Sequence, residues 1–210
     1  MNAPLRTTAQ LRMFEPAEQR VDADFGNARR IDLDGDSWIE HVPGWLSRNE
    51  LLLDALAGAA PWEQRRRWMF TQLVEEPRLT AEFPSLADAP VPVLRHVGQV
   101  LSKRYGVVYD SAWLNLYRDH RDSTAWHGDR PHCRRARCTV PVLSLGETRR
   151  FQIRRHDGGR STTFVMHGGD LIVMGGRCQR DWVHCVPKET RPTSARISVN
   201  FGSSFQAQPE

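Results

Sequence analysis

The chain has 210 residues, of which 40% are hydrophobic and 26% charged, with a formal net charge of +4. This length allows one domain with a sizeable core, and the composition is that of an ordinary globular protein. No apolar run approaches the roughly 20 residues of a membrane-spanning helix, and the first residues lack the apolar core of a signal peptide. We therefore expect a cytoplasmic protein without a membrane partner.

The first part of the chain carries few clear elements. Residues 1–35 are polar and show little periodicity, so we expect a poorly ordered N-terminal arm. At its end, Ile31 and Leu33, followed by Trp38 and Ile39, indicate a short strand or two.

The first predicted helix spans residues 48–58. It is preceded by Ser47-Arg48-Asn49-Glu50, which matches a capping box in which the serine and glutamate side chains bond to each other's backbone N–H. Leu46 and Leu51 stand where a hydrophobic staple would form.

Residues 62–84 are irregular and combine aromatic residues with a basic run, so this segment could form strands or a lid over a site. A second helix is predicted to begin near Pro92, which a first helical turn tolerates, and to end at Gly106.

From residue 107 onward the chain shows short strands separated by glycine-rich turns, a pattern typical of a sandwich or barrel. Alternation in the first strand places Trp113, Asn115 and Tyr117 on one face. We expect a single domain over 36–210 that is mainly β with flanking helices (α+β). The strands are expected at 112–117, 138–145, 149–155, 162–166, 171–174 and 195–201.

The four cysteines, at positions 133, 138, 178 and 185, do not form a dense disulfide framework. In a reducing compartment we expect free thiols. The gaps within the two pairs are wider than the two to four residues usual between zinc ligands, which disfavours structural zinc.

Arginine is concentrated in the middle of the chain. Residues 118–160 contain eleven arginines against five acidic residues. Such an excess suits an anionic partner such as nucleic acid. It is equally compatible with a solvated surface, because only Lys103 and Lys188 are lysines and arginine is this chain's general cation.

A metal site is predicted around Trp126-His127-Gly128-Asp129. Side chains two residues apart on an extended backbone point the same way, so His127 and Asp129 can hold one ion together. His184, in a turn-rich segment over 177–187, is the candidate third ligand. Two histidines and one carboxylate form the facial triad of non-haem Fe(II) oxygenases.

Arg196 begins the last predicted strand, and parity places Ser198, Asn200 and Gly202 on its face. An inward arginine following a facial triad suggests a dicarboxylate cosubstrate, with one carboxylate on iron and the other held by the planar guanidinium.

Over roughly residues 40–201 the sequence resembles the AlkB family of Fe(II)- and 2-oxoglutarate-dependent dioxygenases, in particular a short bacterial branch. The resemblance rests on several motifs: Pro77-Arg78-Leu79, Trp113-Leu114-Asn115-Leu116-Tyr117-Arg118, Ala125-Trp126-His127-Gly128-Asp129, Leu143-Ser144-Leu145-Gly146-Glu147-Thr148-Arg149-Arg150-Phe151, Gly169-Asp170-Leu171-Ile172-Val173-Met174-Gly175-Gly176, His184-Cys185-Val186-Pro187-Lys188 and Arg196-Ile197-Ser198-Val199-Asn200-Phe201.

The resemblance implies a double-stranded β-helix (jelly-roll) core, about 107–205, and a substrate lid, about 62–84. It implies Fe(II) on His127, Asp129 and His184, the catalytic residues. The cosubstrate 2-oxoglutarate would bind Arg196, with Asn115, Tyr117 and Ser198 beside it. Together with O2, these cofactors would support oxidative dealkylation of N-alkylated bases in DNA or RNA, as in alkylation damage repair. Substrate contacts are expected from Phe83, Trp62, Arg78 and Trp126.

The chain departs from the family pattern at Gly202, where a second arginine usually stands six residues after the first. That arginine helps hold the cosubstrate and the ligating carboxylate, so its loss leaves open weaker cosubstrate binding, compensation by another group, or altered function. The alternatives to base repair are an oxygenase of the same fold acting on a small molecule or a protein, and a catalytically weak nucleic-acid-binding module. We expect a monomer.

Overall fold

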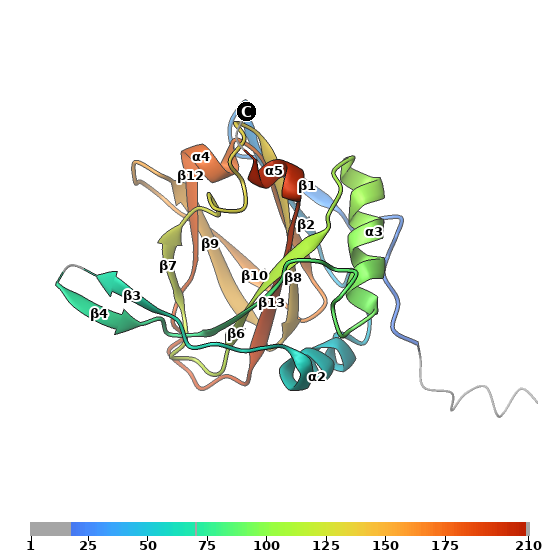
Figure 1. Cartoon of the computed structure of the whole chain (residues 1–210). Coiled ribbons are helices and arrows are strands. Elements are labelled where there is room, and N and C mark those ends of the chain that lie inside the picture. Colours follow the sequence, from blue (N-terminus) through green and yellow to red (C-terminus); the bar gives the residue numbers. More distant parts are fainter. Residues whose placement is uncertain (1–17, 70, 209–210) are drawn as a thin grey trace, which may run out of the picture.

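We analysed a computed structural model, which describes residues 18–69 and 71–208. Two antiparallel sheets face each other, with the larger covered on its outer side by helices (Figure 1). The larger sheet is built from β1 (Arg29–Asp32), β2 (Ser37–Val42), β5 (Leu79–Phe83), β6 (Ser111–Tyr117), β8 (Cys138–Gly146), β11 (Leu171–Gly176) and β13 (Arg196–Gly202). Its strand order is β1-β2-β11-β8-β13-β6-β5.

The smaller sheet has the order β10-β9-β12-β7. Its strands are β7 (Thr124–His127), β9 (Arg149–Arg155), β10 (Thr162–Met166) and β12 (Trp182–Val186). The helices are α2 (Asn49–Ala59), α3 (Val93–Tyr105), α4 (Cys178–Asp181) and α5 (Ser204–Ala207). None of these helices, in the described part of the chain, is long and apolar enough to cross a membrane.

Side-chain alternation divides the interior into two layers. On β13, Ile197, Val199 and Phe201 pack in the outer core against the helices. The residues between them point the other way, toward the smaller sheet, where Arg196 and Ser198 are buried. β13 therefore presents polar groups to the space between the sheets, while its opposite side is apolar; β2, β8 and β11 of the same sheet add apolar residues to that space. The predicted mainly β fold with flanking helices is confirmed, and two facing antiparallel sheets are consistent with a jelly roll.

The first helix begins without the predicted cap. Its N-terminal residue Arg48 is in the left-handed region, with φ of 52°, and no side chain caps it. The hydroxyl of Ser47 instead accepts a hydrogen bond from the backbone N–H of Arg20, 2.9 Å away. Leu51 is 45% exposed, so the hydrophobic staple is also absent. The helix was predicted correctly, but a tertiary contact took over the residue expected to start it.

The second helix matches the prediction. It ends at Gly106, whose φ of 67° explains the glycine, because this conformation is strained for residues with a side chain. Leu94, Val97 and Leu101 form its buried face.

Part of the expected N-terminal arm is ordered, which corrects that prediction for residues 18–35. Phe25 is buried and packs on Trp45, 5.6 Å between ring centroids. Val21 bridges to Leu46, and β1 pairs with β2. Residues 1–17 lie outside the described residues.

The segment expected to be a lid forms a hairpin and an edge strand. β3 (Arg66–Met69) pairs with β4 (Gln72–Glu75) as a separate two-stranded sheet, which projects away from the body of the molecule (Figure 1). β5 then joins the edge of the larger sheet beside β6.

The cysteines correct the expectation of four free thiols. Cys133 and Cys138 form a disulfide that closes the loop between β7 and β8, while Cys178 and Cys185 are free and buried. Sequence spacing could not show this, because the pairing depends on how that loop folds back on itself.

Candidate metal centre and adjoining cavities

Three ligand-type side chains meet at one end of the smaller sheet. His127 is the last residue of β7 and pairs in register with His184 on β12, so the two imidazoles lie side by side with ring centroids 4.3 Å apart. Asp129 follows two residues after β7. Its carboxylate oxygens lie 3.6 Å from Nε2 of His127 and 3.5 Å from Nε2 of His184. The expected turn at residue 184 is therefore a strand.

The ring nitrogens of both histidines are suited to bind a cation. Nδ1 of His127 lies 2.8 Å from the carbonyl oxygen of Ala125, which only accepts, so Nδ1 carries the proton and Nε2 keeps its lone pair. Burial lowers the pKa of His184 to about 4, so this ring is neutral at neutral pH. One ligand atom from each of the three residues lies within 4.8 Å of the others. This donor set fits Fe(II) in a facial triad.

Asp129 is held by a residue that the sequence prediction missed. Gln179, in α4, accepts a hydrogen bond from the backbone N–H of Asp129 and donates one to its carboxylate. A lone glutamine in a turn-rich segment carries no sequence signal for this contact.

Behind the triad, Arg196 is buried with its guanidinium 5.2 Å from the ring centroid of Tyr117. Its Nε donates to the Ser144 hydroxyl at 3.0 Å, but its Nη1 has no partner among the described residues. Burial lowers the pKa of Arg196, and the nearby charge of Arg149 adds to this. A buried guanidinium N–H without an acceptor is costly, which makes this a ready site for an anion.

A second buried arginine gives the contrast. Arg149 lies on the other side of the same tyrosine, with its guanidinium 5.4 Å from the ring of Tyr117. Its terminal nitrogens donate to the carbonyl oxygens of Asp119, Asp122 and Pro187 at 3.1, 2.7 and 2.8 Å. Its Nε makes no hydrogen bond among the described residues but lies 3.8 Å from a carboxylate oxygen of Glu189. Both terminal nitrogens of Arg149 are thus used by the structure, whereas Nη1 of Arg196 is left for a ligand.

The other predicted cosubstrate residues surround Arg196 as parity suggested. Asn115 lies opposite Ser198 in the β6–β13 pairing and donates to its hydroxyl at 3.2 Å. The hydroxyl of Tyr117 lies 2.6 Å from that of Thr124. All of these residues line one small cavity with the three ligand-type side chains. A buried arginine with one unpaired terminal nitrogen and a facial triad, both lining this cavity, fit a dicarboxylate that chelates a metal.

A second cavity, of about 160 Å³, adjoins the same site. One wall is the indole of Trp113 stacked on the imidazole of His132, with ring centroids 3.9 Å apart and planes within 7°. Burial lowers the pKa of His132, so a neutral imidazole faces the cavity. On β5, Thr80 and Glu82 line the cavity, and Glu82 pairs with Arg65 at 2.7 Å.

Three of the four expected substrate residues lie elsewhere. Phe83 packs in the outer core, because alternation along β5 turns it away from Glu82 and the cavity. Trp62 packs against the same core and donates to the carbonyl of Leu56. Trp126 lies outside the smaller sheet over the guanidinium of Arg154, at 4.5 Å.

The fourth expected residue is Arg78, whose role stays a prediction. Arg78 lines the cavity, donates to the side chain of Asn115 at 2.8 Å and pairs with Glu76 at 2.9 Å. His132, in contrast, is not among the expected substrate residues, yet it lines the same cavity. Its stacking on Trp113 depends on the fold of the disulfide-closed loop.

The glycine that replaces the family's second arginine lies in a filled position. A Cβ atom at Gly202 would lie 2.7 Å from the Ser111 hydroxyl and 3.3 Å from the indole of Trp113. Trp113 therefore occupies the space into which a side chain at 202 would extend.

Comparisons with known proteins agree with this arrangement. Residues 66–201 match the family described as the 2OG-Fe(II) oxygenase superfamily. The chain is 31% identical over 187 residues to the human alpha-ketoglutarate-dependent dioxygenase alkB homolog 3, covering 78% of this chain and 65% of the human protein. It is 26% identical over 143 residues to the DNA oxidative demethylase ALKBH2 of Arabidopsis thaliana, covering 57% and 43% of the two chains.

Two solved structures share the fold. "The structure of OsALKBH1" superposes with a TM-score of 0.55 at 12% identity, covering 83% of this chain and all of that one. An oxidoreductase of the 2OG-Fe(II) oxygenase family from Burkholderia pseudomallei gives 0.52 at 12% identity, covering 80% and 88%. The expected resemblance to AlkB proteins is thereby confirmed.

Proposed function

Because the chain belongs to the 2OG-Fe(II) oxygenase superfamily, whose cofactors are Fe(II), 2-oxoglutarate and O2, we propose that this oxidoreductase removes alkyl groups from the nitrogens of bases in DNA or RNA. The observation that carries the proposal is the arrangement of two adjoining cavities around one His–Asp–His cluster. One cavity contains a buried arginine with an unpaired terminal nitrogen, and the other has a flat aromatic wall.

In this proposal His127, Asp129 and His184 hold the iron, and Arg196 holds the distal carboxylate of 2-oxoglutarate. Asn115, Tyr117 and Ser198 complete the cosubstrate cavity. When bound, iron, 2-oxoglutarate and O2 supply the oxidising power that turns an N-alkyl carbon into a hydroxyalkyl group, which leaves as an aldehyde, with succinate and CO2 as the other products.

The chain's own residues bind and orient the substrate. The Trp113–His132 stack offers a flat surface of the kind on which a nucleobase packs, with a gain of roughly 1–3 kcal/mol per stacked base. Glu82, which pairs with Trp113 in the β5–β6 register, offers charged and hydrogen-bonding groups in the same cavity together with Arg65 and Arg78. A base within a duplex would have to flip out to enter this cavity.

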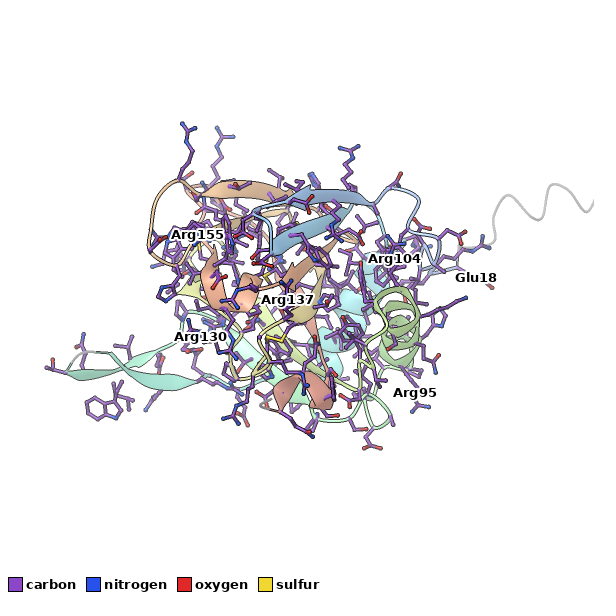
Figure 2. The ribbon with its side chains drawn as sticks, turned by 90° about the horizontal axis from the view of Figure 1, so that it is seen from above. Glu18, Arg95, Arg104, Arg130, Arg137 and Arg155 are labelled. Carbon is purple, nitrogen blue, oxygen red and sulfur yellow. A yellow bond between two sulfur atoms is a disulfide. The ribbon has the colours of Figure 1, made fainter. Side chains whose placement is uncertain are left out.

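The β3–β4 hairpin is the proposed nucleic-acid contact outside the cavity. It projects from the body, and the labelled Arg130 lies on the same side of the molecule (Figure 2). Trp68 is 73% exposed and Leu73 51%, although both are large apolar residues. Arg66, beside them, pairs with Glu75 at 2.7 Å, so the hairpin offers mainly exposed apolar groups of the kind on which bases stack.

The experiment incubates the protein with Fe(II), 2-oxoglutarate and oligonucleotides carrying 1-methyladenine or 3-methylcytosine, as single- and double-stranded DNA and as RNA. Demethylation and succinate are measured together. We expect demethylation that is abolished by His127→Ala and weakened by Trp68→Ala, with the buried site intact in the second variant.

Three outcomes separate the candidate functions. Demethylation dependent on His127 supports base repair. Succinate without demethylation of any oligonucleotide points to an oxygenase acting on a small molecule or a protein. Binding of oligonucleotides without succinate formation points to a catalytically weak nucleic-acid-binding module.

A further inference from the structure

Gln179 makes two hydrogen bonds to one residue of the His–Asp–His cluster. Its Oε1 accepts from the backbone N–H of Asp129 at 2.7 Å, and its Nε2 donates to Oδ2 of the same residue at 3.3 Å. Only 1% of Gln179 is exposed. The residue lies in α4, which runs directly into β12, so one short segment supplies both His184 and the side chain that grips Asp129.

The orientation of this amide is dictated by its partners. A backbone N–H only donates, so the amide oxygen must face it, and the amide nitrogen is then directed at the carboxylate. The same Nε2 lies 3.5 Å from the sulfur of Met174. The amide therefore keeps one arrangement, and Oδ2 of Asp129 is held on the side of the carboxylate nearest His184.

The backbone between the two ligands is shaped for this contact. A Cβ atom at Gly128 would lie 3.1 Å from the carbonyl oxygen of Gln179 and 3.7 Å from its Oε1. The glycine thus lets the turn between His127 and Asp129 approach α4 closely enough for both hydrogen bonds to form.

We propose that Gln179 is a positioning residue for the metal site: it fixes the backbone and the carboxylate of Asp129 before the metal arrives. The inference rests on the proposed metal ligands, and it does not depend on the substrate. A neutral amide from α4 thus holds the ligating carboxylate in a chain that has Gly202 where the resemblance leads one to expect an arginine. Removing a partner that orients a metal ligand typically lowers metal affinity by about 10- to 100-fold.

The test uses Mn(II) as the probe and the full chain. Mn(II) affinity is measured by electron paramagnetic resonance and calorimetry, and the d–d absorption of bound Co(II) reports the ligand geometry. Gln179→Met removes both hydrogen bonds at similar side-chain length. Gln206→Met is the matched control: Gln206 also lies buried in a four-residue helix and also forms two hydrogen bonds to one residue, the backbone of Thr139, at 2.7 and 3.0 Å.

We expect Mn(II) affinity about 10- to 100-fold weaker in Gln179→Met, together with an altered Co(II) spectrum. Gln206→Met should bind like the wild type even if its thermal stability falls as much. Should Gln179→Met fail to fold, Gln179→Asn keeps a buried amide that is too short to reach both atoms of Asp129, and the same weakening is expected.

Wild-type affinity and spectrum in a folded Gln179 variant would overturn the inference, as would equal weakening in the Gln206 control. Asp129→Ala tests the proposed site itself. If Asp129→Ala binds Mn(II) as tightly as the wild type, the assigned ligands are wrong. If it loses the metal while Gln179→Met does not, only the role of Gln179 is refuted.

Discussion

Replacing Arg196 by methionine should separate ligand binding from stability. The guanidinium is buried, and burial lowers its pKa. One of its terminal nitrogens has no hydrogen-bond partner among the described residues. Without a ligand, this charge costs free energy, and the hydrogen bond to Ser144 that the change removes offsets only part of that cost. Replacing a buried charge by an apolar group of similar size is often neutral or stabilising. We therefore expect Arg196→Met to leave the melting temperature without 2-oxoglutarate unchanged or higher.

Binding should change in the opposite direction. Truncating one partner of a buried charge pair costs about 2–5 kcal/mol, which corresponds to roughly 30-fold to several-thousand-fold weaker binding. At a 2-oxoglutarate concentration of about 100 Kd, the wild type gains ~2.7 kcal/mol. For a domain of this size that raises the melting temperature by roughly 5–11 °C. The variant should gain about 0.9 kcal/mol or less at the same concentration.

The assay is differential scanning fluorimetry of the Mn(II)-loaded protein with and without 2-oxoglutarate. Arg149→Met is the matched comparison, because Arg149 is equally buried but donates to three backbone carbonyls. Leaving those acceptors unpaired costs roughly 1–3 kcal/mol each, so this variant should be clearly destabilised. A wild-type ligand shift in Arg196→Met, or a loss of stability equal to that of Arg149→Met, would refute the reasoning.

Three further outcomes are expected. The family pattern suggests that Gly202→Arg should tighten 2-oxoglutarate binding. We expect it to lower thermal stability instead, because a Cβ atom at position 202 would crowd Ser111 and Trp113. Tighter binding with unchanged stability, both measured by calorimetry, would contradict this expectation. Asp170→Asn should destabilise the fold by about 1–3 kcal/mol at neutral pH. Burial raises the pKa of Asp170, but hydrogen bonds from an imidazole and two backbone N–H groups outweigh it and hold the pKa below 3.8. Its stabilisation is therefore present above that value, and urea unfolding should show the difference shrinking as the pH falls below it. His132→Ala should raise KM for a methylated oligonucleotide while leaving KM for 2-oxoglutarate unchanged, and an equal rise in both would argue against a substrate-facing stack.

Much of the fold and the site follows from local patterns. Strand alternation alone placed Asn115 and Tyr117 on one face of their strand, because a period of two needs no tertiary information. It likewise placed Arg196 and Ser198 on one face of the last strand, which proves to be the neighbour of the first in the same sheet. The spacing of His127 and Asp129 predicted a shared ligand position for the same reason. Gly106 ended its helix as expected, since its left-handed conformation is a backbone requirement.

Predictions that depended on contacts between segments distant in the sequence were less successful. Phe83 and Trp62 looked like substrate-stacking aromatics, yet both pack in the outer core. Ser47 stands at the first position of a capping-box motif, but its hydroxyl accepts a hydrogen bond from the backbone N–H of Arg20 instead. Residue type says that such groups need partners, and only the packing of distant segments decides which partners they find.

The sequence by itself determined the residue types available for chemistry. The three ligand-type residues, the inward arginine and the mainly β fold can all be predicted from residue spacing and strand alternation. The tertiary structure decided how these side chains are positioned and which residues line the cavities beside them. It brought Gln179 onto Asp129, stacked His132 on Trp113, joined Cys133 to Cys138 and filled the space at Gly202. These contacts join residues through the folding of loops and short helices, which have no periodicity from which a sequence could reveal them.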